Sequence, residues 1–263
     1  MLIKQGKNKI SWTDFTWNPI SGCLHDCHYC YMKKIENRFK NGIMKPKFHE
    51  DRLNDVSRSR SLKPGDKIFV CSSGDMFGEW NKPEDIERVL EVVRNNPDYI
   101  FQFLTKNPKR YVEFNLPENG WYGTTVDGTF KTIKNFKNLL LAVEHRKRFI
   151  SFEPLKMLPF VFSPYLSYIH WFIIGADSTP GVKKPPKEWA DNLILKAKNA
   201  GIPVHIKSNY GYPEVIQEFP EVRIISKLDS STEKAADRLR SESFAKKVRS
   251  NIKMVKKHKV KVS

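Results

Sequence analysis

The sequence contains no apolar run close to the roughly 20 residues that a membrane-spanning helix needs. Its first ten residues are polar and basic rather than apolar, so we expect no secretory signal. Cysteine is scarce, with 4 in 263 residues, which argues against a disulfide framework and for metal or redox chemistry. Together these absences predict a cytoplasmic protein without a membrane partner.

Acidic residues are also too few to balance the basic ones. The chain has 46 Lys and Arg against 29 Asp and Glu, which gives a formal net charge of +17. A charge of this size favours a polyanionic partner, for which nucleic acid is the first candidate. Basic residues gather at 33–67, at 183–187 and in the tail at 243–263. Because the first group directly follows three of the cysteines, we expect an anionic substrate, with DNA favoured; the alternative is that the lysines only solvate helix faces.

Short apolar runs rich in β-branched and aromatic residues alternate with segments of helical spacing. Near-continuous apolar runs are typical of strands buried on both faces, as in a parallel sheet covered by helices. The alternation predicts an α/β fold, and the number of units indicates a partial (β/α)6-type TIM barrel whose function lies at the carboxyl ends of its strands. A doubly wound open sheet is the alternative. The predicted strands cover 14–20, 67–71, 99–104, 121–126, 148–152, 169–174 and 202–206.

Three helices are predicted between the strands, at 82–94, 129–144 and 187–199. The first of them has Asn81 as its expected cap. The tail differs in composition, because a capping box at 230–233 is followed by apolar residues at helical spacing among basic ones. The expected organisation is a catalytic domain at 1–228 followed by a basic C-terminal helix and tail at 229–263.

Three of the four cysteines, Cys23, Cys27 and Cys30, lie close together in the sequence. Thiolates at this spacing can each bind a separate iron of one cube-shaped 4Fe-4S cluster, which leaves the fourth iron without a protein ligand. Such an open site suits S-adenosylmethionine (SAM), because the amino and carboxylate groups of its methionine part can chelate that iron. A structural zinc site completed by His25 or His28 is the alternative.

The spacing C-x3-C-x2-C, with the aromatic Tyr29 just before the third cysteine, resembles the signature of the radical SAM superfamily. Other motifs resemble a phage- and prophage-associated radical SAM family of unknown function. That family is distantly similar to spore photoproduct lyase, which repairs a thymine dimer in DNA. The resemblance implies a barrel of the radical SAM kind, a 4Fe-4S cluster, SAM and an external electron donor. These motifs lie at 17–19, 151–155, 171–178 and 202–207, with Gly-Ala-Asp-Ser at 175–178 where the family has Gly-Gly-Glu-Ser.

The resemblance also implies where SAM binds. In radical SAM folds the strand after the cluster loop ends in a Gly-Gly-Glu-like motif that binds the SAM amino group, and here the corresponding residues are Ser73, Gly74 and Asp75. Lys106 at the end of the next strand is a candidate partner for the SAM carboxylate. Ordinary turn or surface roles are the alternative for all of these positions. The remaining candidates for cofactor binding are Tyr29, Thr105, Thr124, Thr125, Asp127 and Lys207.

Two residues are candidates for catalysis. Glu153 ends a strongly apolar strand, where a carboxylate is costly to bury without a partner. Cys71 is a candidate hydrogen-atom donor by resemblance to the cysteine near SAM in the photoproduct lyase. Its alternative is the usual one for a free cysteine, a small buried hydrophobe.

The sequence therefore predicts a radical SAM enzyme that modifies or repairs a nucleic-acid base. A 5′-deoxyadenosyl radical formed from SAM would abstract hydrogen from that base. Two alternatives stay open. One is a radical SAM enzyme that acts on a small molecule or peptide, and the other is a non-catalytic basic protein whose cysteines hold zinc and which binds nucleic acid.

Overall fold

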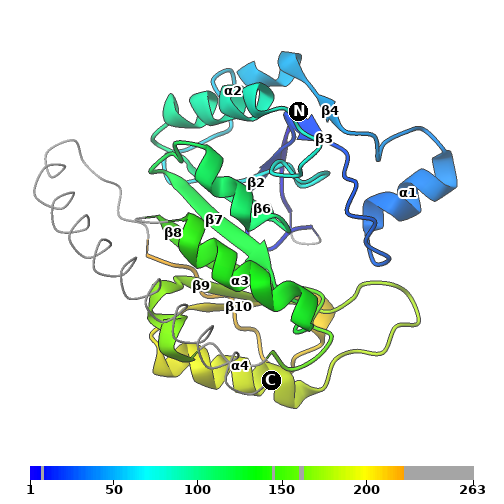
Figure 1. Cartoon of the computed structure of the whole chain (residues 1–263), viewed down its shortest axis with the longest axis vertical. Helices are drawn as coiled ribbons and strands as arrows, with labels where there is room; N and C mark the ends of the chain where they lie inside the picture. The colour runs from blue at the N-terminus through cyan, green and yellow to red at the C-terminus, as the bar shows by residue number, and fades with distance from the viewer. Residues whose placement is uncertain (7–8, 144–145, 160–162, 222–263) are drawn as a thin grey trace, which may run out of the picture.

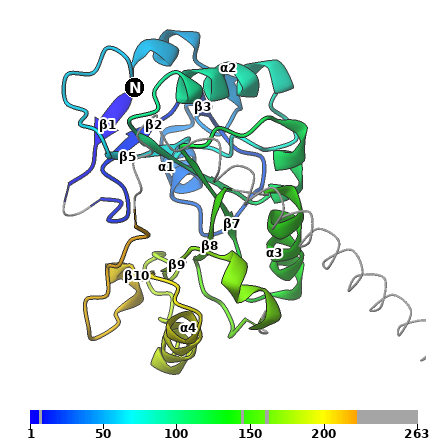
Figure 2. The same ribbon diagram turned by 90° about the vertical axis from the view of Figure 1, so that its left-hand side faces the viewer.

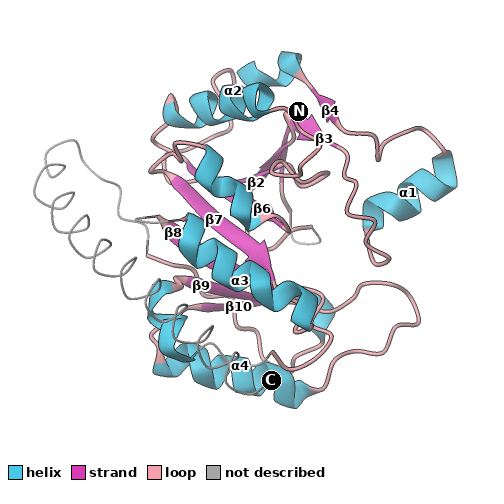
Figure 3. Cartoon of the chain, viewed as in Figure 1, coloured by secondary structure: helices cyan, strands magenta, loops and turns pink. Residues whose placement is uncertain are grey.

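The computed structural model describes residues 1–6, 9–143, 146–159 and 163–221 (Figure 1). The basic helix predicted at 229–263 and the domain boundary predicted at residue 228 lie outside these residues. No helix within the described ranges is both long and apolar enough to traverse a bilayer. The described chain has a mixed α/β structure (Figure 3).

Strands and helices alternate along most of the described chain. The strands are β1 Leu2–Lys4, β2 Phe15–Trp17, β3 Ile20–Ser21, β4 Lys47–Phe48, β5 Lys67–Val70, β6 Ile100–Thr105, β7 Gly120–Thr125, β8 Lys147–Phe152, β9 Trp171–Ile174 and β10 Val204–Ile206. The α-helices are α1 Tyr31–Phe39, α2 Pro83–Arg94, α3 Phe130–Ala142 and α4 Lys187–Asn199. Short 3-10 helices are η1 Glu50–Asn54, η2 Pro108–Glu113, η3 Ser163–Tyr168 and η4 Ser208–Tyr210.

The central sheet has eight strands in the order β1-β2-β5-β6-β7-β8-β9-β10. β1 is antiparallel to β2, and every other neighbouring pair in this sheet is parallel. From β5 onward, successive strands are joined by α2, η2, α3, η3 and α4. Such crossovers return the chain to the same end of the sheet, so the carboxyl ends of the parallel strands lie together.

Most predicted elements are confirmed. Between residues 67 and 206, every predicted strand and α-helix is present with ends within about two residues of those expected. The predicted strand at 14–20 is divided into β2 and β3, with a break before Pro19. The helix α1 was not predicted, because Met32 is its one buried residue and the apolar spacing is correspondingly weak.

Asn81 does not cap α2, contrary to the prediction. The N-cap residue is Lys82, and the Asn81 carboxamide donates instead to the backbone oxygens of Asp75 and Met76, at 2.8 and 3.0 Å. These carbonyls belong to the turn that follows β5. Buried carbonyls need donors, so Asn81 stabilises the turn rather than the helix. Pro83 at the start of α2 supplies the start signal for the helix.

The two faces of the central sheet carry different side chains. Its outer face packs against α2, α3 and α4 in one large apolar core, and Figure 2 shows these helices around the outside of the strands. Its inner face carries a second, aromatic cluster that consists of Trp12, Phe69, Ile100, Trp121, Phe149, Trp171 and Ile173. Because side chains alternate between the faces of a strand, each of the strands β5 to β9 contributes to both clusters. We call the second cluster the aromatic floor, because polar residues follow it along the inner face towards the carboxyl ends of the strands.

The α/β class and the mainly parallel sheet are confirmed, whereas the predicted barrel is not. β1 and β10 form the two edges of the sheet, and no ladder joins them within the described ranges. The N-terminal segment nevertheless reaches the last strand, since Ser11 Oγ lies 2.8 Å from His205 Nε2. Trp12 packs against Trp171 with ring centroids 6.2 Å apart. The inner face is therefore covered at its amino end by this segment.

We expect the protein to lose stability as the pH falls from about 6.5 towards 4. Burial first, and the charge of Lys207 second, lower the pKa of His205 to about 4. An unfolded histidine titrates near pH 6.5, so at lower pH the unfolded chain binds a proton that the buried ring excludes. The resulting loss of unfolding free energy is about 2 kcal/mol at pH 5.

Urea unfolding near pH 7.5 and near pH 5 measures this loss. His205→Gln is the matched variant, because glutamine keeps a polar side chain beside Ser11 but does not titrate. Its midpoint should depend less on pH than that of the wild type. An unchanged pH dependence in the variant would mean that His205 is not the group responsible.

Candidate functional site

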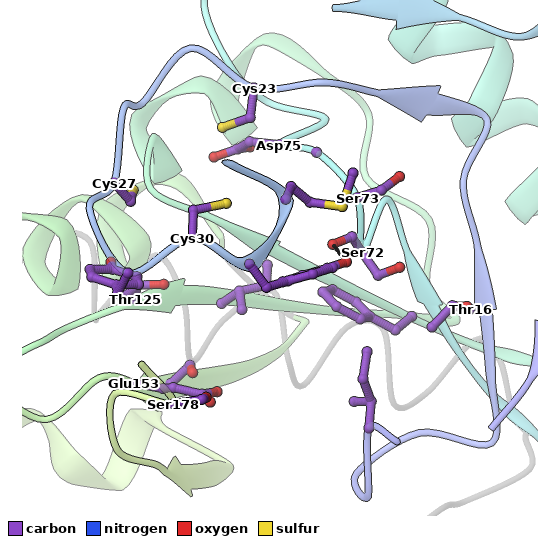
Figure 4. A pocket seen from close by; sticks show the side chains of 18 of the residues that line it. Thr16, Cys23, Cys27, Cys30, Ser72, Ser73, Asp75, Thr125, Glu153 and Ser178 are labelled. Carbon is purple, nitrogen blue, oxygen red and sulfur yellow. Dashed lines mark hydrogen bonds between the residues drawn. The ribbon is translucent and has the colours of Figure 1, made fainter. Parts of the chain in front are cut away.

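The carboxyl ends of the parallel strands border a cavity of about 900 Å³ (Figure 4). Inner-face residues reach its wall from four strands or their ends, namely Leu104, Thr125, Ser151, Glu153 and Lys207. The loop at 22–30 (the cysteine loop) and the turn at 71–75 after β5 (the β5 turn) contribute to the wall, as do the N-terminal segment, α1 and the loop after β9. The cavity thus lies where the parallel-sheet prediction expects a functional site.

The cysteine loop directs three thiols at this cavity. Cys23, Cys27 and Cys30 are half-buried and line it, and Figure 4 shows them along one side. Burial, partly offset by a backbone hydrogen bond at His25, raises the pKa of Cys23 to about 12. Within the described ranges no three His, Cys, Asp or Glu side chains lie close enough to hold a single metal ion. A cube-shaped cluster instead binds each thiolate on a different iron, and the donor set of this loop fits that requirement.

The cysteine loop is bonded directly to the β5 turn. Gly22 and Gly74 form an isolated parallel bridge, in which the Gly22 N–H donates to the Ser73 carbonyl oxygen at 3.1 Å. A Cβ atom at Gly74 would lie only 2.6 Å from the Gly22 carbonyl oxygen, and Gly22 itself has φ = 82°. Glycine is therefore required at both positions for the two backbones to approach this closely.

Asn18 holds the β5 turn from the other side. Its Oδ1 accepts hydrogen bonds from the Ser72 hydroxyl, the Ser73 hydroxyl and the Ser73 N–H, at 3.0 to 3.1 Å. The Asn18 side chain is buried. A buried acceptor with three donors fixes the turn in one conformation, and the predicted residues Ser73 and Gly74 therefore face the cavity in a defined position.

The carboxylate of Asp75 joins three segments around the cavity. Its Oδ2 pairs with His25 Nε2 at 2.7 Å and accepts from the Lys106 backbone N–H at 2.9 Å. Its Oδ1 accepts from the Phe77 N–H at 3.0 Å. The His25 ring also packs edge-on against Trp80, with centroids 4.9 Å apart. A carboxylate has about four lone-pair positions, so Asp75 can still accept one further donor from the cavity.

Lys106 brings a positive charge to the cysteines. Its ammonium donates to Cys27 Sγ at 2.7 Å and to the Tyr29 hydroxyl. Burial alone would lower the pKa of Lys106, but Tyr29 and Cys27 outweigh it and raise the pKa above its usual value. For Tyr29, whose charged form is the anion, burial acts in the opposite direction and raises the pKa to about 12. Lys106 therefore stays charged and Tyr29 stays neutral at physiological pH. Both residues were candidates from the sequence, and both line the cavity.

Glu153 and Lys207 lie in the wall away from Cys23, and Figure 4 shows Glu153 beside Ser178 there. Glu153 Oε1 forms an ion pair with the Lys207 ammonium and accepts from Asn209 Nδ2 at 3.3 Å. The two predicted residues, one after β8 and one after β10, are thus direct partners. Lys207, predicted as a contact of the cofactor, is thus paired with a carboxylate of the chain itself.

Four further predicted residues occupy the ends of β6 and β7. Thr105 and Thr125 line the cavity, whereas Thr124 and Asp127 are not among the described residues of its wall. The Thr124 hydroxyl donates to the Thr105 carbonyl oxygen at 2.8 Å. Asp127 Oδ1 accepts from the Thr129 and Thr132 hydroxyls, each at 2.6 Å, at the start of α3. These local bonds give the side chains of Thr124 and Asp127 structural roles. Contact of either residue with a cofactor stays a prediction.

Cys71 packs in the outer-face core rather than in the described wall of the cavity. Its side chain is buried, and burial raises the pKa of the thiol to about 12. Its backbone has φ = 60°, in the left-handed region where the chain turns sharply after β5. This environment agrees with the alternative of a small buried hydrophobe, and hydrogen donation by Cys71 stays a prediction.

Several residues in or beside the wall were not singled out from the sequence. His25 was considered only as a zinc ligand, yet it is the side-chain partner of Asp75. Lys156 lies 5.1 Å from the centroid of the Tyr29 ring, and Asn209 contacts Glu153. Asn18 belongs to the motif at 17–19 that resembles the radical SAM family, and this motif was the one sequence feature that pointed to it. The other contacts join distant segments, and no local pattern indicates them.

Comparisons with known proteins give a family and one distant structural likeness. A family model described as "Protein of unknown function (DUF5131)" matches residues 7–255. No curated protein matches the sequence. One similar solved structure is a mutant spore photoproduct lyase with bound AdoMet and a dinucleoside spore photoproduct, at 9% identity and a TM-score of 0.46. The alignment covers 71% of this chain and 61% of that protein.

Proposed function

The chain belongs to the DUF5131 family of proteins of unknown function, and we propose that this member is a radical SAM enzyme that acts on a nucleic-acid base, with DNA favoured. One observation carries the proposal: three thiols of a single loop line a cavity at the carboxyl ends of a parallel sheet. Cys23, Cys27 and Cys30 are the proposed ligands of a 4Fe-4S cluster. When bound, that cluster would supply the electron that cleaves SAM to methionine and a 5′-deoxyadenosyl radical, which takes a hydrogen atom from the substrate.

The residues beside the cysteines suit the polar ends of SAM. Asp75 has a lone-pair position left for an ammonium group, and Lys106 offers a charged ammonium for a carboxylate. The hydroxyls of Ser73, Thr105 and Thr125 border the same cavity and are the proposed contacts of the ribose. Small-ligand pockets measure about 300–1,000 Å³, so a cavity of about 900 Å³ has room for SAM and part of a second molecule.

The aromatic floor would keep bulk water from the amino side of the cavity. Trp12 and Phe69 belong to it and also line the cavity, while both are at least nine-tenths buried. A reactive carbon radical needs such shielding, because it can abstract hydrogen from any donor that reaches it. Substrate would then enter from the carboxyl side, between the cysteine loop and the loop after β9.

Positive charge at this opening supports a nucleic-acid substrate. Lys34 of α1 lines the cavity and donates to the Thr179 hydroxyl at 2.9 Å, which joins α1 to the loop after β9. Figure 1 shows α1 and this loop projecting on the same side of the molecule. Arg38, Lys40 and Lys183 are exposed on these two segments. We call them the basic rim, and we propose that they contact phosphates.

The proposal includes an external electron donor and a cytoplasmic location. It retains two roles that no contact of the described residues supports directly, hydrogen donation by Cys71 and cofactor contacts of Thr124 and Asp127. Glu153, predicted as a catalytic residue, is assigned below to substrate binding instead.

Anaerobic reconstitution with iron, sulfide, SAM and a reductant tests the proposal. We expect a brown protein that forms 5′-deoxyadenosine, and faster formation when single-stranded or duplex DNA is added. Formation that DNA does not change would favour the alternative of a small-molecule or peptide substrate. A protein that holds tetrahedral zinc, takes up no iron and leaves SAM intact would favour the zinc alternative and end the proposal.

A further inference from the structure

A second polar group lies in the cavity wall away from the cysteines. Glu153 follows β8, while Lys207 and Asn209 follow β10, so the parallel crossovers bring the three side chains together. Asn209 Nδ2 also donates to the Ala176 carbonyl oxygen at 2.8 Å, which ties the group to the end of β9. We call these three residues the Glu153 group.

The Glu153 group is held more firmly than an ordinary surface ion pair. The side chains of Glu153 and Lys207 are 23% and 21% exposed, and both line the cavity. Glu153 packs directly on Gly175, where an added Cβ would lie 2.9 to 3.0 Å from its side-chain atoms. Residue 175 must therefore stay small for the carboxylate to keep this position. A partly buried and packed pair loses little side-chain entropy when it binds a ligand.

The hydrogen bonds of this group leave a free acceptor beside a free donor. The described contacts of the Glu153 carboxylate all use Oε1, so the lone pairs of Oε2 stay available. The Lys207 ammonium has three protons and uses one of them on Glu153. The pair therefore offers the cavity one acceptor and one donor at neighbouring positions.

The charges of Glu153 and Lys207 cancel, so the group does not attract an anionic ligand as an isolated lysine would. For a carboxylate of SAM, attraction by Lys207 is offset by repulsion from Glu153, which amounts to roughly 1 to 4 kcal/mol for like charges about 4 Å apart at effective dielectric constants of 80 to 20. A neutral group with an N–H next to a carbonyl oxygen or ring nitrogen meets no such repulsion. The Watson–Crick edge of a nucleobase has this pattern of neighbouring donors and acceptors.

We propose that Glu153 and Lys207 bind the Watson–Crick edge of the substrate base, with Glu153 Oε2 as acceptor and the Lys207 ammonium as donor. This inference rests on the proposed function and specifies the subsite for its substrate. It changes the proposed role of Lys207 from binding the cofactor to binding the substrate. Trp12, Phe69 and Leu104, which line the same cavity, offer apolar surface for the rest of the base.

Such an edge is paired inside a duplex and becomes accessible only when the base is extruded or single-stranded. The subsite therefore also predicts that single-stranded DNA binds better than a duplex of the same length. Glu153 and Lys207 act here as binding residues that distinguish a nucleotide with a base from an abasic one.

Equilibrium binding of two fluorescent single-stranded oligonucleotides of equal length tests the subsite. One carries ordinary mixed bases and the other carries abasic sites at its central positions, so their affinity ratio measures recognition of bases rather than phosphates. A bidentate contact contributes about 1 to 3 kcal/mol of discrimination, which corresponds to a ratio of roughly 5 to 150. Glu153→Gln and Lys207→Met should each bring that ratio close to one.

Two further variants control for folding and for charge. Lys187→Met breaks the exposed ion pair with Asp191 on α4, which is outside the cavity, and should keep the wild-type ratio. Lys207→Met leaves Glu153 without its ammonium partner, so the double variant Glu153→Gln with Lys207→Met replaces the ion pair by neutral side chains. Glu153→Gln, Lys207→Met and the double variant should all lose base discrimination. The melting temperature of each variant identifies any protein that has not folded.

Three results would overturn the subsite. They are a wild-type ratio close to one, a ratio unchanged in the folded double variant, or weaker SAM binding in Glu153→Gln with base discrimination intact. The last result would assign the group to the cofactor. Failure of the proposed function is distinguished because it appears as absence of iron and of 5′-deoxyadenosine, whatever the oligonucleotide affinities are.

Discussion

Cys27→Ala should yield a folded protein that holds no stable 4Fe-4S cluster and forms no 5′-deoxyadenosine from SAM. Each of the three thiols is the proposed ligand of a separate iron, so the loss of one leaves an iron without its protein ligand. We expect the same result for Cys23→Ala and Cys30→Ala. Product formation should fall by at least about 100-fold in each variant, because electron transfer to SAM depends on the intact cluster. Iron and sulfide analysis with a product assay under anaerobic conditions measures both effects.

His28→Ala is the matched control in the same loop. The His28 side chain is 70% exposed, and its nearest acidic partner is Asp177 at 3.9 Å. The cluster assignment predicts that this variant keeps its iron and its product formation. A zinc site completed by His28 predicts loss of metal instead. Retention of full activity in any of the three cysteine variants would contradict the ligand assignment.

Charge reversal of the basic rim should weaken DNA binding by about tenfold or more near 0.1 M salt. The variant carries Arg38→Glu, Lys40→Glu and Lys183→Glu, all exposed in the wild type. Each phosphate contact contributes about −0.9 to the slope of log affinity against log salt, so the loss of three contacts should flatten it by about 2.7. Fluorescence anisotropy with one oligonucleotide at several salt concentrations gives both the affinity and the slope.

The control reverses three exposed charges at the amino side of the sheet. Arg60 and Lys63 precede β5, and Lys198 lies near the end of α4. This variant has the same net charge as the rim variant, so a general electrostatic attraction would weaken binding equally in both. Equal slopes in the two variants would show that the rim does not contact phosphates.

The sequence predicts the strands and helices well because each carries its own local signal. The run at 67–71 and the helix at 187–199 are recognisable from apolar spacing and end signals alone, and both are confirmed. The cysteine loop is equally local, since the three proposed ligands lie within one short segment. The chain closure needed for a barrel is not local, and the edges of this sheet, β1 and β10, could not be inferred from any one segment.

The contacts inside the site were the least predictable part. Asp75 and Lys106 were identified by their positions at strand ends, but their partners His25 and Cys27 depend on how the cysteine loop folds back. Glu153 and Lys207 were identified separately, and their pairing follows only from the curvature that brings β8 and β10 to one cavity. Asn81 was misassigned for a different reason, because the turn that precedes α2 competes with the helix for its side chain.

At the carboxyl ends of β7, β8 and β10, side-chain alternation gives odd-numbered residues to the cavity and even-numbered residues to the helix layer. Thr125, Ser151 and Lys207 line the cavity, whereas Tyr122, Ile150 and Ile206 belong to the outer core. Point changes at these three odd positions therefore alter the wall of the cavity and leave the apolar core under the helices intact. A single-residue insertion within one of these strands would exchange the two sets beyond it, and would place apolar groups in the reaction space and polar groups under the helices.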